Sequence, residues 1–259
     1  MKVITLTKKR ILSVFSCFMI GAIALTVCTA TANRVVQTVS EERQIPIYYV
    51  DTDKKVCAIS FDAAWGNEQT DTLLDILDDY DAKATFFLVG EWVEKYPDDV
   101  KNIADHGHEI GNHSSTHAHM SELSKEQQLA EIEDCNDKVK ALTGKAPTLF
   151  RAPYGEYNNS LVETVKSDNM YCVQWNIDSL DWKNPSADDM VKRIKSKLCP
   201  GSIILMHNGA QNTPEALPKI LEMIKSSGYE IVLISDLLIS GPYDIQVDGK
   251  MVSTSDNEA

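Results

Sequence analysis

The sequence predicts an α/β fold in which a mainly parallel sheet curls into a complete or incomplete barrel. Seven short apolar runs rich in β-branched residues recur along residues 56–240, which is typical of buried strands. Amphipathic stretches of helical length separate most of these runs, as in a parallel sheet with helices outside. Seven such units favour one barrel over two separate domains. A doubly wound open sheet is the alternative, but no G-x-G-x-x-G motif follows the first strand.

The expected strands divide the chain into a central domain with a segment on either side. They cover 56–61, 84–88, 108–111, 147–151, 171–175, 202–206 and 230–234. One helix is predicted from Ser124, where "SKEQ" fits a capping box, to Gly144. Another is predicted from "TPEAL", with Pro214 in its first turn, to Gly228. We therefore expect a lead-in segment at 33–55, a single domain at 56–240 and a polar tail at 241–259.

The first 32 residues predict a signal peptide or a signal anchor. "MKVITLTKKR" is basic, and a run without charged residues follows it. The length of the apolar run, close to the ~20 residues that span a bilayer, favours an uncleaved anchor. The small residues at 30–32 would instead suit cleavage near Ala32. Because the positive flank stays inside, the rest of the chain is expected outside, either membrane-anchored and facing outward or secreted.

Charge and cysteine usage argue against two classes of function. Beyond residue 32 the net charge is near −17, which would repel phosphate backbones, so no nucleic-acid partner is expected. The four cysteines of this part form no C-x-x-C pair, and a domain of this size needs no disulfide bonds. Buried thiols are therefore expected rather than a cysteine zinc site or nucleophile, at Cys57, Cys135, Cys172 and Cys199.

Residues able to do chemistry follow five of the expected strands. They are Asp62 after the first strand, His113 and His117 after the third, Arg151 after the fourth, Asp178 and Asp181 after the fifth, and His207 after the sixth. In a parallel α/β barrel the loops that follow the strands gather on one face, where active sites lie. We therefore expect these side chains to converge on one site.

Several interpretations of these residues stay open on spacing alone. Two histidines four residues apart, His113 and His117, can bind one metal ion or can simply cap a loop. His207 suits a general acid or base, a third metal ligand, or a buried structural histidine. Trp182 and Leu205 suit either the core or the apolar wall of a small acyl pocket.

Five motifs occur in order along residues 45–240: "SFDAAWG", "HSSTH", "RAPYG", "DSLDW" and "ILMH". As an ordered set they resemble the polysaccharide deacetylase family, also called the NodB-homology family or carbohydrate esterase family 4. More narrowly, they resemble its sporulation-associated branch, whose members carry an N-terminal membrane segment. The resemblance implies a distorted (β/α)7 barrel that hydrolyses the N-acetyl groups of peptidoglycan or of N-acetylglucosamine oligomers and releases acetate. We expect a monomer with a role in sporulation.

The resemblance also implies roles for individual residues. His113 and His117 match the ligands of a divalent metal, for which zinc is the first expectation and cobalt, nickel or manganese are alternatives. Asp62 matches the catalytic base and Arg151 its partner. The other matches are His207 as the acid that protonates the departing amine, Asp181 as its carboxylate partner, Tyr154 as the backbone N–H donor to the oxyanion, and Trp182 and Leu205 as walls around the acetyl methyl.

The sequence departs from the family at Ala63. Most members have two adjacent aspartates here, of which the first is the base and the second a metal ligand. Alanine has no donor atom, so metal binding is expected to be weaker. Asp62 can then remain the base or turn to ligate the metal. The third alternative is that catalysis has been lost and the protein binds glycan without turnover. Since a pure binding module has no need of His207 or Arg151, we expect an enzyme, with glycan binding alone as the alternative.

Overall fold

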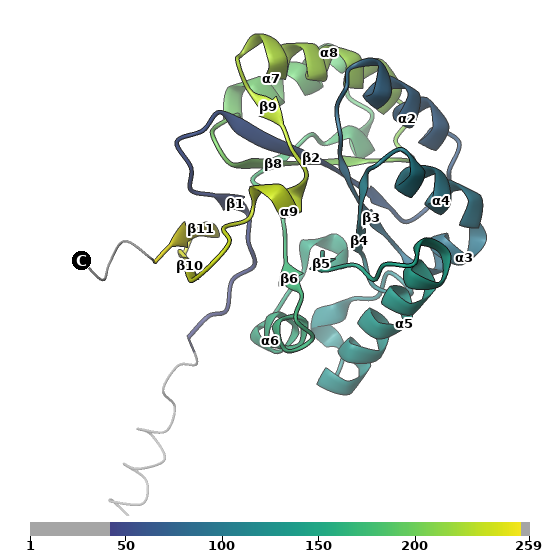
Figure 1. Cartoon of the computed structure of the whole chain (residues 1–259), viewed down its shortest axis with the longest axis vertical. Coiled ribbons are helices and arrows are strands. Elements are labelled where there is room, and N and C mark those ends of the chain that lie inside the picture. Colours follow the sequence, from purple (N-terminus) through teal and green to yellow (C-terminus); the bar gives the residue numbers. More distant parts are fainter. Residues whose placement is uncertain (1–41, 255–259) are drawn as a thin grey trace, which may run out of the picture. The chain divides into compact units, whose positions relative to one another are not determined.

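The computed structural model describes residues 42–254, in which a curled and mostly parallel sheet carries helices on its outer side (Figure 1). From β8 the strand order runs β8-β2-β3-β4-β5-β6, with every pair parallel, while β7 pairs with β8 and β9 with β2. These strands are β2 (Val56–Ala63), β3 (Thr85–Leu88), β4 (Glu109–Asn112), β5 (Leu149–Phe150), β6 (Tyr171–Cys172), β7 (Ile177–Asp178), β8 (Ser202–His207) and β9 (Glu230–Ile231). Each of the seven expected runs overlaps one of them, and the expected α/β fold class is confirmed.

The helices follow the strands as the alternating pattern predicts. They are α2 (Thr70–Asp79), α3 (Gly90–Lys95), α4 (Pro97–Asp105), α5 (Lys125–Thr143), α6 (Asn159–Ser167), α7 (Ala187–Lys197), α8 (Thr213–Ser226) and α9 (Ile234–Leu237). The expected capping box is present, because the Ser124 and Gln127 side chains each accept a hydrogen bond from the other residue's backbone N–H. Gly144 ends α5 at φ 77°, a left-handed conformation that glycine adopts without strain.

Side-chain alternation along β2 decides which residues reach the barrel interior. Ile59, Phe61 and Ala63 belong to the core between the sheet and its helices. Ala58 belongs to a second hydrophobic cluster on the inner side of the curled sheet, here called the interior cluster. Ser60 and Asp62 lie on the same face of β2 as Ala58, because strand side chains alternate. The strand therefore delivers the Asp62 carboxylate to the interior at its carboxyl end. It directs the methyl group of Ala63 towards the helices.

The segments on either side of the domain both contribute strands, and those in the predicted polar tail were not expected. The predicted polar tail contains a hairpin, β10 (Tyr243–Ile245) and β11 (Lys250–Ser253). The latter pairs with β1 (Tyr49–Val50), which is itself antiparallel to β8. Met251 is fully buried in the interior cluster, so this part of the tail is structural. The signal was present in the sequence, because an Asp-Gly turn at 248–249 separates two alternating runs.

The expected signal peptide or anchor at 1–32 lies outside the described residues, as does most of the lead-in segment. Over residues 42–254, no helix has both the length and the apolar character required to cross a membrane.

All four cysteines of the described part carry free thiols; Cys57, Cys135 and Cys172 are buried as expected, whereas Cys199 is only half-buried. Burial raises the pKa of Cys57, Cys135 and Cys172 to about 12. Thiols of such high pKa remain protonated at neutral pH and are poor nucleophiles.

His108, next to the start of β4, makes the stability of the fold depend on pH. Burial lowers the pKa of His108 to about 4, and its Nδ1 accepts a hydrogen bond from the Ala84 N–H. Its folded pKa lies below the unfolded value of 6.5, so stability is lost as the pH falls from about 6.5 towards 4. From pH 7 to pH 5, His108 is expected to account for roughly 2 kcal/mol of lost unfolding free energy.

The measurement is urea unfolding of the wild type and of His108→Gln at both pH values. The variant keeps a side-chain acceptor but has no titrating imidazole, so its loss of stability on acidification should be smaller by that amount. An identical loss in the two proteins would contradict the assignment to His108.

Candidate active site

A cavity of about 430 Å³ opens at the carboxyl ends of the strands, where the sequence places its reactive residues. Seven of the nine predicted site residues line it: Asp62, His113, His117, Tyr154, Trp182, Leu205 and His207. The remaining two, Arg151 and Asp181, are fully buried and contact lining residues. The structure therefore brings the whole predicted set together.

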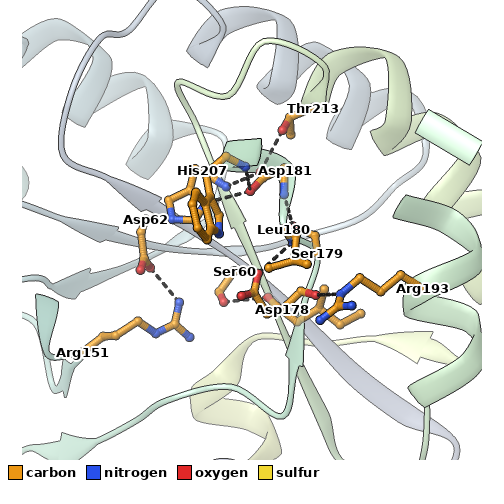
Figure 2. Close-up of polar contacts among 12 residues, drawn as sticks. Ser60, Asp62, Arg151, Asp178, Ser179, Leu180, Asp181, Arg193, His207 and Thr213 are labelled. Atoms are coloured by element: carbon orange, nitrogen blue, oxygen red, sulfur yellow. Dashed lines mark hydrogen bonds and ion pairs between the residues drawn. The ribbon is translucent and has the colours of Figure 1, made fainter. Parts of the chain in front are cut away.

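Asp62 and Arg151 form a buried ion pair beside the cavity (Figure 2). The Arg151 Nη1 donates to Asp62 Oδ1 over 2.7 Å, Nη2 donates to the Gln174 carbonyl, and the guanidinium lies 3.9 Å above the Phe87 ring. Burial by itself would raise the pKa of Asp62. The positive charge of Arg151 and the nearby histidines lower the pKa by more than burial raises it, so the net shift is downward. Asp62 is therefore an anion at neutral pH with one oxygen, Oδ2, facing His113.

The "HSSTH" loop presents His113 and His117 to the cavity, with ring centroids 5.0 Å apart. Helix α5 holds this loop, because the Glu131 carboxylate accepts hydrogen bonds from the Ser115 and Thr116 backbone N–H groups and from the Thr116 hydroxyl. His113 Nδ1 donates to the Arg151 carbonyl oxygen at 2.8 Å. That bond fixes the tautomer and leaves the Nε2 lone pair directed towards Asp62 Oδ2, 3.5 Å away.

His207 at the end of β8 forms a second charged pair with Asp181 (Figure 2). Its Nδ1 donates to Asp181 Oδ1 at 2.8 Å, and its backbone N–H and the Thr213 hydroxyl both donate to Oδ2. Burial lowers the pKa of His207, but the hydrogen bond and negative charge of Asp181 outweigh it, so the net shift is upward. Asp181 thus orients the imidazole and favours its protonated form.

Aromatic and aliphatic side chains form the remaining walls. Tyr154 adopts φ 59° in the turn Pro153–Gly155, and its exposed ring lies between His117 and His119 at 4.6 and 4.3 Å. Trp182 is also exposed, and Leu205 is buried at the cavity wall. The site therefore combines a polar floor with apolar sides, as ligand-binding pockets do.

The donor set fits a divalent ion held by two imidazoles and lacks the third ligand. Burial lowers the pKa of His113, and lowers that of His117 to about 4, so both are neutral and able to ligate at pH 7. Position 63 offers only a methyl group, packed in the helix-facing core. Among residues 42–254, no group of three or more histidine, cysteine, aspartate or glutamate side chains is placed to hold a metal ion.

The sequence analysis did not select three further residues that line the cavity, Trp65, Trp175 and Asp178. Each lies just after a strand or at its end, which was the criterion that found Asp62 and His207. Trp175 was missed because only ionisable side chains and family motifs were considered, whereas Trp65 lies within the motif "SFDAAWG" but was given no role. Asp178 was noted as a strand-end carboxylate but given no role.

A proton acceptor and a proton donor in one apolar-walled cavity are what hydrolysis of an unreactive bond requires. The fold and the site are therefore those that a hydrolase built on a curled α/β sheet would use.

Comparison with known proteins assigns the chain to a family. Residues 49–173 match the family model for polysaccharide deacetylase. A peptidoglycan-N-acetylglucosamine deacetylase of Bacillus cereus is 37% identical, over 73% of this chain and 91% of that protein. Protein YlxY of Bacillus subtilis, which is uncharacterized, is 35% identical over 74% of this chain and 60% of its own length. The chain belongs to the polysaccharide deacetylase family, which confirms both the expected family and the expected class of hydrolase.

One of the similar solved structures is that of a pseudoenzyme. BA3943 of Bacillus anthracis, described as a pseudoenzyme of carbohydrate esterase family 4, superposes with a TM-score of 0.72 at 34% identity. The match covers 79% of this chain and 69% of BA3943. A mutant of BA3943 has restored enzymatic activity. This family therefore contains both active and inactive members of the same fold.

Proposed function

We propose that this protein hydrolyses N-acetyl groups of peptidoglycan and releases acetate. The observation that carries the proposal is the pairing of Asp62 with His207. They are register partners on the neighbouring strands β2 and β8, they line one cavity, and their pKa values are shifted in opposite directions. Such a pair supplies an acid and a base at the same pH.

Asp62 acts as the proton acceptor. Arg151 keeps it ionised and holds Oδ1, so that Oδ2 is the oxygen available to a water molecule in the cavity. Because Asp62 is 6% exposed, its negative charge is weakly screened by solvent.

His207 acts as the proton donor. An amide nitrogen is a poor leaving group unless it is protonated as the carbon–nitrogen bond breaks. Asp181 stabilises the imidazolium and fixes Nδ1, so the proton delivered to the departing amine is that on Nε2. The amine leaves on the sugar, and the acetyl carbon takes up the oxygen of water to give acetate.

The walls of the cavity orient the acetyl group. Leu205 and Trp182 offer apolar surface to the methyl, while the left-handed turn at Tyr154 supports the role of its backbone N–H as a donor to the oxyanion. In such sites a divalent metal supplies Lewis acidity, which polarises a carbonyl and lowers the pKa of water. His113 and His117 are the residues that would hold it, and zinc remains the first expectation for its identity.

Glycan binding without turnover is the second candidate, and one observation favours it. Position 63 supplies no ligand, so that a metal would be held by two imidazoles alone. The existence of a pseudoenzyme in the same family, BA3943, is consistent with this candidate. The complete pairs Asp62–Arg151 and His207–Asp181 favour the enzyme, because binding alone would require neither buried pair.

The test is acetate release by the full-length protein from peptidoglycan and from N-acetylglucosamine oligomers. The protein is stripped of metal and then assayed with zinc, cobalt, nickel or manganese. We expect metal-dependent release that falls at least about 100-fold in Asp62→Asn, since general bases contribute about that much. Analysing the products would show whether N-acetylglucosamine or N-acetylmuramic acid is deacetylated. Binding of the oligomers with no release under any metal would instead favour the second candidate.

The narrower expectations from the sequence remain predictions. They are the sporulation-associated branch, attachment to a membrane through the N-terminal segment, location outside the cell, and the monomeric state.

A further inference from the structure

Trp65 is an exposed aromatic residue at the active site to which the mechanism gives no role. It follows β2 and is 54% exposed. Among the described residues four large hydrophobic side chains are exposed, and three of them, Trp65, Tyr154 and Trp182, line the main cavity. Exposed aromatic rings gathered at one cavity indicate a ligand surface rather than scattered surface apolarity.

The position of Trp65 is fixed by its neighbours. Its ring is stacked with that of His207 at 6.0 Å and meets the His117 ring edge-on at 6.1 Å. A Cβ at Gly209 would lie 2.7 Å from the Trp65 carbonyl oxygen and 3.4 Å from its indole Cδ1, so the absence of a side chain at 209 makes room for it. The next residue is tied down as well, because the Trp92 indole N–H donates to the Gly66 carbonyl at 2.6 Å.

A second cavity of about 220 Å³ lies beside the main one and shares three of its lining residues, Trp65, Trp182 and His207. It adds the amide side chains of Asn184 and Gln211. A pyranose ring presents C–H groups on its faces and hydroxyl groups around its edge. Aromatic rings suit those faces, and amides both donate to and accept from hydroxyls.

We propose that the second cavity is a subsite for the sugar next to the one that is deacetylated, with Trp65 as its stacking platform. The proposal rests on the proposed function, since it extends the same glycan along the site. It makes Trp65 a specificity residue that favours chains over single sugars. Shielding of His207 from water is the competing role for Trp65, and it would act equally on substrates of every length.

The test is calorimetric titration of the full-length protein with N-acetylglucosamine and its disaccharide and tetrasaccharide, using wild type, Trp65→Ala and Trp65→Phe. We expect the wild type to bind the longer ligands more tightly than the monosaccharide. Trp65→Ala should lose about tenfold in affinity for the two longer ligands and little for the monosaccharide. Trp65→Phe should recover part of this loss. Val247→Ala, which removes another exposed apolar side chain that lines neither cavity, should behave as the wild type.

Binding rather than turnover is measured, so the result also holds for a protein that binds glycan without hydrolysis. Equal losses for all three ligands, or no loss in Trp65→Ala, would overturn the subsite and leave the proposed function intact. A wild type that binds none of the ligands and also releases no acetate would overturn both.

Discussion

Arg151→Met is expected to lower the free energy of unfolding by about 3–5 kcal/mol and to abolish deacetylation, because it leaves a buried charge without its partner. Arg151 is fully buried, and its guanidinium both pairs with Asp62 and packs on Phe87. Methionine would fill much of the same volume but could not neutralise the carboxylate. Burial would then dominate and raise the pKa of Asp62, so that the base would be protonated and unable to accept a proton.

The measurement is urea unfolding of Arg151→Met, Asp62→Asn and the double variant at pH 7 and pH 5. In the double variant no charge is left buried, so its stability should exceed that of Arg151→Met. The raised pKa of Asp62 in Arg151→Met gives a sign that can be checked: relative to the wild type, the variant should gain stability as the pH falls and the carboxylate becomes protonated. A loss below about 1 kcal/mol, as expected for an exposed pair, would contradict the buried ion pair.

Ala63→Asp is expected to tighten zinc binding at least about tenfold, because a carboxylate that leaves the helix-facing core for the cavity adds a charged ligand to the two imidazoles. The structure also predicts a cost. Ala63 is fully buried in the core that faces the helices, so a carboxylate that fails to reach the metal would lie in an apolar environment. Without metal, the variant should be less stable than the wild type by about 1–3 kcal/mol. Zinc should recover that loss.

Zinc affinity by calorimetry and thermal unfolding with and without zinc check this prediction together. Ala63→Asn is the matched control, since it has nearly the same shape without the charge and should gain little affinity. Acetate release by Ala63→Asp at limiting zinc should rise if weak metal binding limits the wild type. Equal zinc affinity in the wild type and Ala63→Asp would show that position 63 cannot reach the metal.

The strand and helix pattern was readable in the sequence because these elements depend on local periodicity and end signals. Each expected strand run overlaps a strand, and α5 lies between its predicted caps, Ser124 and Gly144. The hairpin at 243–253 was missed although its turn signal is local. A two-stranded element of this kind gains its stability from non-local contacts, here pairing with β1 and burial of Met251.

The sequence by itself determined the family, the order of the strands along the chain and the identity of the reactive groups, because each follows from motifs and from strand ends. Only the tertiary structure showed that Asp62 and His207 are register partners, with Arg151 and Asp181 buried behind them. It also placed Trp65 between two cavities and turned Ala63 towards the helices. Pairing register, burial and the direction of a side chain depend on residues far apart in the chain, so spacing along the sequence cannot supply them.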